Sequence, residues 1–111
     1  MANASEFISD VQRYDPAANE ETVGKIVKHL GIALQRDNGG NLVDSGLVSA
    51  TDQTELDRVR DKWGIAKLGL DEGTAAQIVS TVATEMSADR RKNRVTFYYL
   101  AAKHAGKLDA L

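Results

Sequence analysis

The chain has 111 residues, no cysteine and a formal net charge of −2. This length suits one domain that buries a core without metals, and the lack of cysteine excludes disulfides and thiolate chemistry. The negative net charge argues against general affinity for nucleic acids or membrane surfaces. No apolar run reaches transmembrane length and the first residues show no secretory signal, so we expect a soluble, cytoplasmic protein without a membrane partner.

Two helices are expected in the first third of the chain. A short helix over about residues 6–14 follows Ser5 as its N-cap, and Pro16 prevents its continuation. A second helix begins after Asn19, which is a good N-cap residue. Its apolar residues recur at helical spacing: Val23, Ile26, Val27, Leu30 and Leu34.

Residues 36–51 are the least helical part of the sequence, because they are rich in glycine, asparagine, aspartate and serine. They contain two short apolar pairs, Leu42–Val43 and Leu47–Val48. These pairs are compatible with a minimal hairpin, but a two-stranded ribbon alone is only marginally stable. We therefore predict one long ordered loop that the four apolar side chains pin to the core.

A third helix is predicted after Thr51 or Asp52, and Glu55 stands at capping-box spacing from Asp52. We expect this helix to end at Gly64 and its Trp63 to close one end of the core. The connector that follows contains Gly69, which is expected to adopt a backbone conformation that other residues avoid.

A fourth helix is predicted from Asp71, its N-cap, through about Met86. Its inward positions form a regular apolar stripe, and its remaining positions are mostly threonine, serine and glutamine with few charges. Because only Ser87 separates it from the next helical pattern, we expect the fourth and fifth helices to form an antiparallel pair.

The fifth helix, from about Asp89 to Gly106, is expected to be the central element of the fold. Ser87 is its predicted N-cap and Gly106 stands where a C-cap glycine would stand. Tyr98, Tyr99 and Leu100 lie in its wide apolar face, which predicts contact with two neighbouring elements and burial of all three side chains.

The start of this helix carries the strongest basic cluster in the chain. Residues 88–111 hold six bases and two acids, whereas residues 1–61 hold six bases and eleven acids. Cations at a helix N-terminus oppose the helix dipole, so an anionic partner would offset an unfavourable arrangement. A solvated charged face is the alternative. The candidate binding residues are Arg90, Arg91, Lys92 and Arg94, together with Lys67.

No sequence motif for catalysis, a cofactor or a metal is present, and we predict no such residues. His29 and His104 are single residues on different helices, whereas a metal site needs several convergent ligands. Asp57 and Asp61 share a helix face, which is typical of a solvated outer surface. Arginines beside tyrosines also occur in proteins that bind single strands, but the acidic composition disfavours nucleic acid here.

Three segments carry a family resemblance: ELDRVRDKWGIAKLGL, the basic run DRRKNR, and TFYYLAAKHAGK. They resemble a bacterial family, domain of unknown function 2853, over about residues 47–107. The combination of F-Y-Y-L with K-L-G-L is specific, whereas the N-terminal third is less similar and residues 37–41 look like a local insertion. The resemblance implies a small helical domain, assigns no activity and transfers no catalytic residue.

These observations predict a single all-α domain over residues 1–111, built as a five-helix bundle with one long ordered loop at about 36–51. The leading functional hypothesis is a non-enzymatic binding or assembly module that uses the basic cluster to hold an acidic protein or a small anion. Self-association as a structural homo-oligomer is one alternative, because the acidic and basic ends of the chain can pair between copies. An enzyme of a type that the sequence does not identify is the other.

Overall fold

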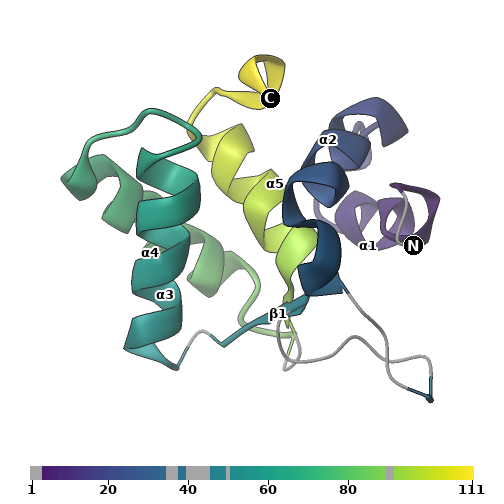
Figure 1. Cartoon of the computed structure of the whole chain (residues 1–111), viewed down its shortest axis with the longest axis horizontal. Helices are drawn as coiled ribbons and strands as arrows, with labels where there is room; N and C mark the ends of the chain where they lie inside the picture. Colours follow the sequence, from purple (N-terminus) through teal and green to yellow (C-terminus); the bar gives the residue numbers. More distant parts are fainter. Residues whose placement is uncertain (1–3, 35–37, 40–45, 50, 90–91) are drawn as a thin grey trace.

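The computed structural model describes residues 4–34, 38–39, 46–49, 51–89 and 92–111. Within these residues five α-helices pack into one body, and the strands are limited to two short segments (Figure 1). The prediction of a mostly helical fold is confirmed. None of the described helices is long and apolar enough to cross a membrane.

The first helical segments are α1 (Ile8–Gln12) and α2 (Glu20–Leu30), each next to a short 3-10 turn, Ala4–Glu6 before α1 and Gly31–Leu34 after α2. The predicted cap of α2 is confirmed, because the Asn19 side chain accepts a hydrogen bond from the backbone N–H of Thr22 at 2.8 Å. By contrast, α1 is shorter than predicted and begins after Phe7 without a side-chain cap. Ser5 therefore does not cap it.

The third helix does not end at Gly64 as predicted. It comprises α3 (Gln53–Val59), which Asp52 caps, and then the π-helix η4 (Arg60–Ile65). Gly64 lies inside η4, where a Cβ atom would stand 2.8 Å from the Cβ of Ala75. The glycine therefore serves close packing against α4 (Glu72–Glu85) rather than helix termination. Gly69, with a φ of +72°, has the special backbone predicted for it.

The fifth helix, α5 (Arg94–His104), begins later than predicted, and its cap is Asn93 instead of Ser87. Before it, β2 (Lys92–Asn93) pairs antiparallel with β1 (Leu47–Val48). An extended segment thus replaces the predicted first turn. The C-terminal end of α5 is as predicted, with Gly106 at a φ of +68°, and the 3-10 turn η5 (Leu108–Ala110) follows.

The predicted loop over residues 36–51 lies partly outside the described residues, including Leu42–Val43. Within the described part, Leu47–Val48 forms a strand whose partner is β2, about 45 residues away in sequence. The sequence analysis missed this pairing, because strands of two residues carry no periodic signal.

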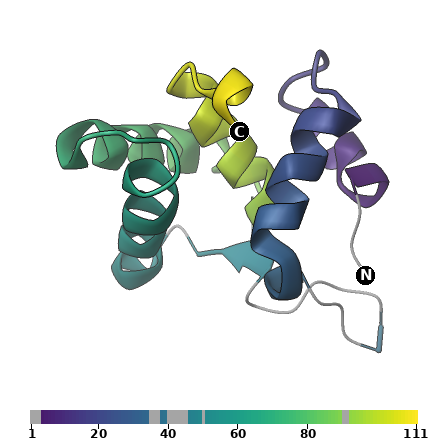
Figure 2. The same ribbon diagram turned by 45° about the horizontal axis from the view of Figure 1, so that its top comes forward.

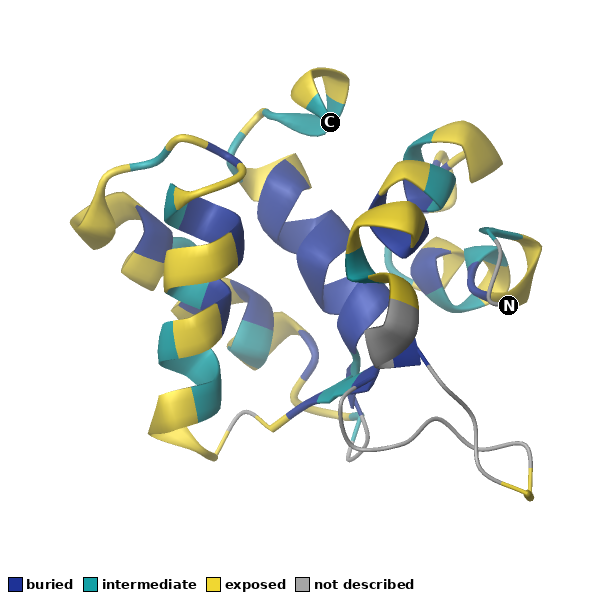
Figure 3. Cartoon of the chain, viewed as in Figure 1, coloured by how far each residue is buried: buried dark blue, intermediate teal, exposed yellow. Residues whose placement is uncertain are grey.

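The centre of the fold is α5, as predicted. Residues 94–102 are buried without exception, and Figure 3 shows this helix as the most continuously buried element. Figure 2 shows it passing between the α1–α2 pair and the α3–α4 pair. Leu100 is fully buried, and Tyr98 and Tyr99 are 5% and 3% exposed. A helix with core on all sides needs no polar face, which explains its wide apolar arc.

Candidate functional site

The predicted basic cluster is divided between different environments. Arg90 and Arg91 lie outside the described residues. Lys92 is buried, and its Nζ donates to the carbonyl of Asp89 at 2.7 Å. Arg94 is also buried, whereas Lys67 is exposed on the segment that follows η4. The described members therefore do not form one exposed surface, and binding at this cluster stays a prediction.

Arg94 joins three elements from inside the protein. Its Nη2 donates to the carboxylate of Glu55 in α3 and to the carbonyl of Leu47 in β1, the latter at 2.9 Å. Its Nη1 donates to the hydroxyl of Tyr98 at 3.3 Å, and the guanidinium lies 5.7 Å from the centre of that ring. A guanidinium presents several donors in a fixed plane, so one side chain can hold these groups together.

A row of stacked rings continues from Tyr98 to the surface. Trp63 stacks on Tyr98 with ring centres 4.7 Å apart, and its Nε1 donates to the carbonyl of Tyr98 at 3.0 Å. His29 of α2 then contacts Trp63 at 5.0 Å with a tilt of 56°. His29 is exposed, but it also covers Trp63, which is 1% exposed.

The contact with Trp63 changes the acid–base behaviour of His29. Partial burial lowers the pKa of its imidazole, and the nearby positive charge of Lys67 lowers it further. Both causes disfavour the imidazolium form. His29 is therefore a neutral ring near pH 7, next to a cation that belongs to a different element.

A groove of about 440 Å³ lies between α3 and α4. Its floor is apolar and contains Leu56, Val79 and Ala83, and its rim is polar. The remaining lining residues are Gln53, Asp57, Arg60, Ala76, Ser80, Thr84 and Ser87. This volume is within the range of ligand-binding clefts, and an apolar floor with a polar rim is typical of them.

One end of this groove is acidic. The guanidinium of Arg60 lies 2.7 Å from Asp61, 3.4 Å from Asp57 and 3.8 Å from Glu72. Its hydrogen bond to Asp61 raises the pKa of Arg60 and lowers that of Asp61. One cation thus faces three carboxylates, which leaves a local excess of negative charge. Asp57 and Asp61 are part of a charged outer face, as predicted.

The exposed surface of α4, of which Ala76, Ser80 and Thr84 line the groove, is unusual for a helix that faces solvent. Nine residues of α4 are exposed, and only Glu72 and Glu85 at its two ends are charged. Between them the exposed side chains are short and uncharged: Gly73, Thr74, Ala76, Gln77, Ser80, Thr81 and Thr84. Solvent-facing helix surfaces are ordinarily rich in charge, so the low charge of this surface is unusual.

A second polar cluster fastens α1 to α5. The hydroxyl of Tyr99 donates to Asp15 at 2.7 Å, and Lys103 stands 3.6 Å from the same carboxylate. The hydrogen bond from Tyr99 is the main cause that lowers the pKa of Asp15, whereas burial raises the pKa of Tyr99. The hydroxyl of Thr96 donates to Asp10 in the same region. These carboxylates have internal donors, which indicates a structural role.

Asp89 makes a similar contact with the two residues that follow α1. It accepts from Nη2 of Arg13 at 2.8 Å and from the hydroxyl of Tyr14 at 2.7 Å. These two donors, Arg13 first, lower the pKa of Asp89. Burial, followed by the hydrogen bond to Asp89, raises the pKa of Tyr14 to about 12. Asp89 was predicted to lie in the first turn of the fifth helix, and this contact explains why it does not.

Neither cluster has the features of a catalytic or metal centre. In the part of the chain that the structure describes, no three potential ligands converge closely enough to hold a metal ion. His104 pairs with Glu85 at 2.9 Å and does not line the groove. The groove itself was missed in the sequence analysis. The low charge of the fourth helix was visible there, but only the packing of α3 beside α4 turns it into the wall of a cleft.

The comparisons with known proteins give one informative result. A family model described as a protein of unknown function, DUF2853, matches residues 6–109. Neither the curated proteins nor the solved structures yield a significant match. The matched range includes the N-terminal third, beyond the residues that suggested the resemblance. The chain therefore belongs to the DUF2853 family.

Proposed function

We propose that this protein is a non-enzymatic binding module that holds a helical segment of a partner protein in the groove between α3 and α4. The observation that carries this proposal is the groove itself, with an apolar floor and a wall of short, uncharged side chains. Such a wall favours binding of a protein over catalysis, because it offers contact area but few side chains that could transfer protons.

The side chains of α4 favour a helix as the occupant. Ala76, Ser80 and Thr84 are four residues apart and therefore follow one another along one face of α4. Short side chains let the backbone of a second helix approach closely. They also lose little conformational freedom when they become buried, which lowers the entropic cost of association.

The acidic end of the groove adds a requirement on the partner. Because Asp57, Asp61 and Glu72 surround the single cation of Arg60, a lysine or arginine of the partner would find unbalanced carboxylates there. Such rim charges mainly affect the rate and specificity of association. We therefore expect an amphipathic helix whose apolar face carries small residues and whose one end is basic.

Photo-crosslinking from a position inside the groove and from a position outside it tests this proposal. A photoreactive residue at Ser80, inside the groove, should crosslink a partner in an extract of the native host. The same residue at Thr81, which is exposed on α4 but does not line the groove, should not. Ser80→Arg should reduce capture by about tenfold, which corresponds to roughly 1.4 kcal/mol, and Thr81→Arg should leave it unchanged. Equal crosslinking from the two positions would contradict the proposal.

Self-association through the same wall is the second candidate, because an uncharged helix face also suits a symmetric interface. In that case the main crosslinked species from Ser80 is a second copy of the chain. Analytical ultracentrifugation would then show a dimer that Ser80→Arg dissociates. A monomer at low and at high salt removes this candidate.

We also propose that the module works in the cytoplasm of a bacterial cell. The lack of cysteine is compatible with a reducing compartment. The bacterial origin rests on the family resemblance described above. Fractionation of the native host with an antibody against the protein tests the location.

A further inference from the structure

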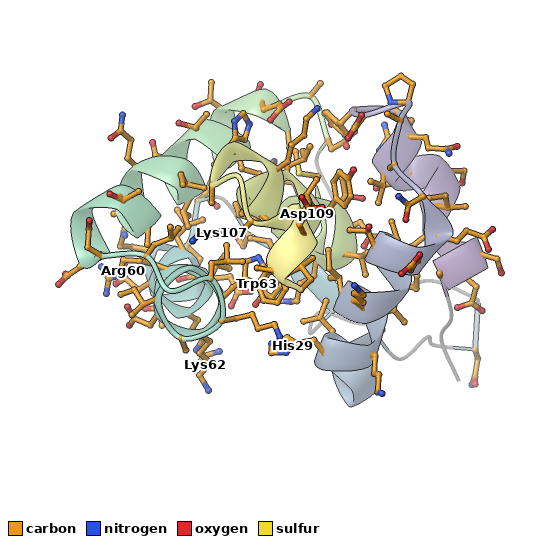
Figure 4. All side chains as sticks on the ribbon, turned by 90° about the horizontal axis from the view of Figure 1, so that it is seen from above. His29, Arg60, Lys62, Trp63, Lys107 and Asp109 are labelled. Carbon is orange, nitrogen blue, oxygen red and sulfur yellow. The ribbon has the colours of Figure 1, made fainter. Side chains whose placement is uncertain are left out.

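The side chains around His29 form a surface that is distinct from the groove. His29 and Lys25 are four residues apart on α2 and share one face, and Lys62 and Lys67 stand on η4 and just after it. We call Lys25, His29, Lys62 and Lys67 the cationic seam. All four are exposed. Figure 4 shows His29 and Lys62 on the same side of Trp63, with Lys107 and Asp109 on its other side.

The three lysines of the seam differ from five of the eight other lysines and arginines that the structure describes. Arg13, Arg58, Arg60, Arg94 and Lys103 each form an ion pair with a carboxylate. Within the described ranges, no ion pair joins a seam residue to a carboxylate. The acidic residues nearby in sequence do not neutralise the seam lysines. Asp61, next to Lys62, is paired with Arg60, and Glu21 lies one turn before Lys25 without a hydrogen bond or ion pair to it.

The fold holds two of these residues close together. Trp63 fixes the ring of His29 against η4, and the backbone N–H groups of Lys67 and Leu68 both bond the carbonyl of Trp63, at 3.2 and 2.9 Å. Lys67 therefore stands one helical turn beyond Trp63, on the element that His29 contacts. Lys67 lies close enough to His29 for its charge to lower the pKa of the imidazole.

We propose that the cationic seam binds a carboxylate-rich segment of a partner protein. Charge complementarity carries this inference, because exposed lysines of two elements flank the contact between His29 and Trp63 and form no ion pair with a described carboxylate, in a chain whose net charge is −2. The net negative charge disfavours nucleic acid, whose dense phosphates would be repelled by the rest of the surface. The proposal is independent of the groove, since the two surfaces share no residue.

Acetylated hexaglutamate is a suitable probe, and two signals report directly on the seam. Trp63 is the only tryptophan, so its fluorescence reports on its contact with His29. NMR titration gives the pKa of His29, which carboxylates bound beside it should raise. We expect saturable binding that weakens as salt is added, together with an upward shift of this pKa.

Matched lysine variants test the position of binding. Lys67→Gln and Lys62→Gln should each weaken hexaglutamate binding by about threefold. Lys107→Gln removes the same charge on the other side of Trp63 from His29 and Lys62, and it should have no effect (Figure 4). An equal loss for all three variants, or binding without a change in the pKa of His29, overturns the proposal.

Two further probes separate the ligand classes. Inorganic phosphate and a thymidine dodecamer are titrated under the same conditions, and hexaglutamate should bind more tightly than either. Tighter binding of phosphate or of the oligonucleotide would show that the seam selects phosphates, which also overturns the proposal. The crosslinking outcome at Ser80 does not affect any of these results.

Discussion

Arg94 has an environment in the fold that differs from the one its sequence neighbours suggest. As one of four basic residues within five positions, it resembles part of a solvated or ligand-binding surface. In the fold its side chain is 11% exposed and faces Glu55, which is 13% exposed. A buried ion pair gives little net stability over an apolar pair, but the loss of one partner leaves an uncompensated charge. Arg94 should therefore matter for folding whether or not the protein has a ligand.

Arg94→Met is expected to lower the free energy of unfolding by about 3 kcal/mol, because Glu55 then loses its main partner and the carbonyl of Leu47 loses a donor. Arg94→Met combined with Glu55→Gln should cost less than the sum of the single changes. Urea titration of the three variants measures this coupling. Additive losses would show that the two side chains do not act as a pair.

At the scale of elements, the π-helix η4 deserves a physical explanation because π-helices are rare and usually brief. It brings Trp63 onto Tyr98 and places Gly64 against Ala75 of α4 at the same time. An added Cβ at position 64 would stand 2.8 Å from the Cβ of Ala75, closer than two carbon atoms can pack. The lack of a side chain at Gly64 therefore sets how closely η4 and α4 approach.

Gly64→Ala is expected to destabilise the protein by about 1–3 kcal/mol through overpacking. Gly73→Ala is the matched control, because the nearest atom to its added Cβ is 3.6 Å away and alanine favours helix. It should be neutral or stabilise by about 0.5 kcal/mol. Thermal unfolding of both variants decides the matter, and a Gly64→Ala variant as stable as the wild type would refute the close approach.

For the whole molecule, the attachment of α1 to the rest of the fold depends on ionised carboxylates. Asp15 and Asp89 accept hydrogen bonds from Tyr99, Tyr14 and Arg13, and these donors hold both pKa values below the ordinary 3.8. A carboxylate whose pKa is lower in the folded than in the unfolded state stabilises the fold at pH values above its unfolded pKa. That contribution is lost as the pH falls through the folded pKa. Acid should therefore loosen the N-terminal segment.

Asp15→Asn and Asp89→Asn should each cost about 1–2 kcal/mol at pH 7, since a charge-assisted hydrogen bond becomes a neutral one. The difference from wild type should shrink below pH 3.8, where aspartate becomes neutral in the unfolded chain and then in the folded one. Asp109→Asn, at an exposed position, is the control. Urea titrations at a series of pH values measure these differences, and a loss that is independent of pH would contradict the linkage.

Local sequence patterns predicted the presence of the helices, most of their caps and the central position of the last helix. Asn19, Asp52 and Asp71 cap their helices as expected, because a cap needs only a short polar side chain beside its own helix. The start of α5 was not predictable. Both Ser87 and Asn93 are good caps, and the choice depends on Arg13, Tyr14 and β1, which are remote in sequence.

The candidate surfaces were less predictable than the fold. The sequence predicts Lys67 as a member of a cluster with Arg94, whereas the fold places it beside His29. The polar composition of α4 was apparent, but its meaning as the wall of a groove depends on α3 lying next to it. A binding surface is formed by side chains of several elements that lie next to each other in space. The spacing of residues within one helix does not show which other elements will lie beside it.

The amino-acid sequence alone determined the helical class, the membership of α5 in the core and the exclusion of thiol chemistry. Composition and apolar spacing are properties of a few helical turns of one segment, so the helices can be predicted from them without knowledge of the tertiary structure. Among the described residues, the tertiary structure decided which charged side chains form ion pairs and which do not. That outcome depends on side chains tens of residues apart, such as Arg94 with Glu55 and His29 with Trp63, because charge pairing and burial are set by distances in space.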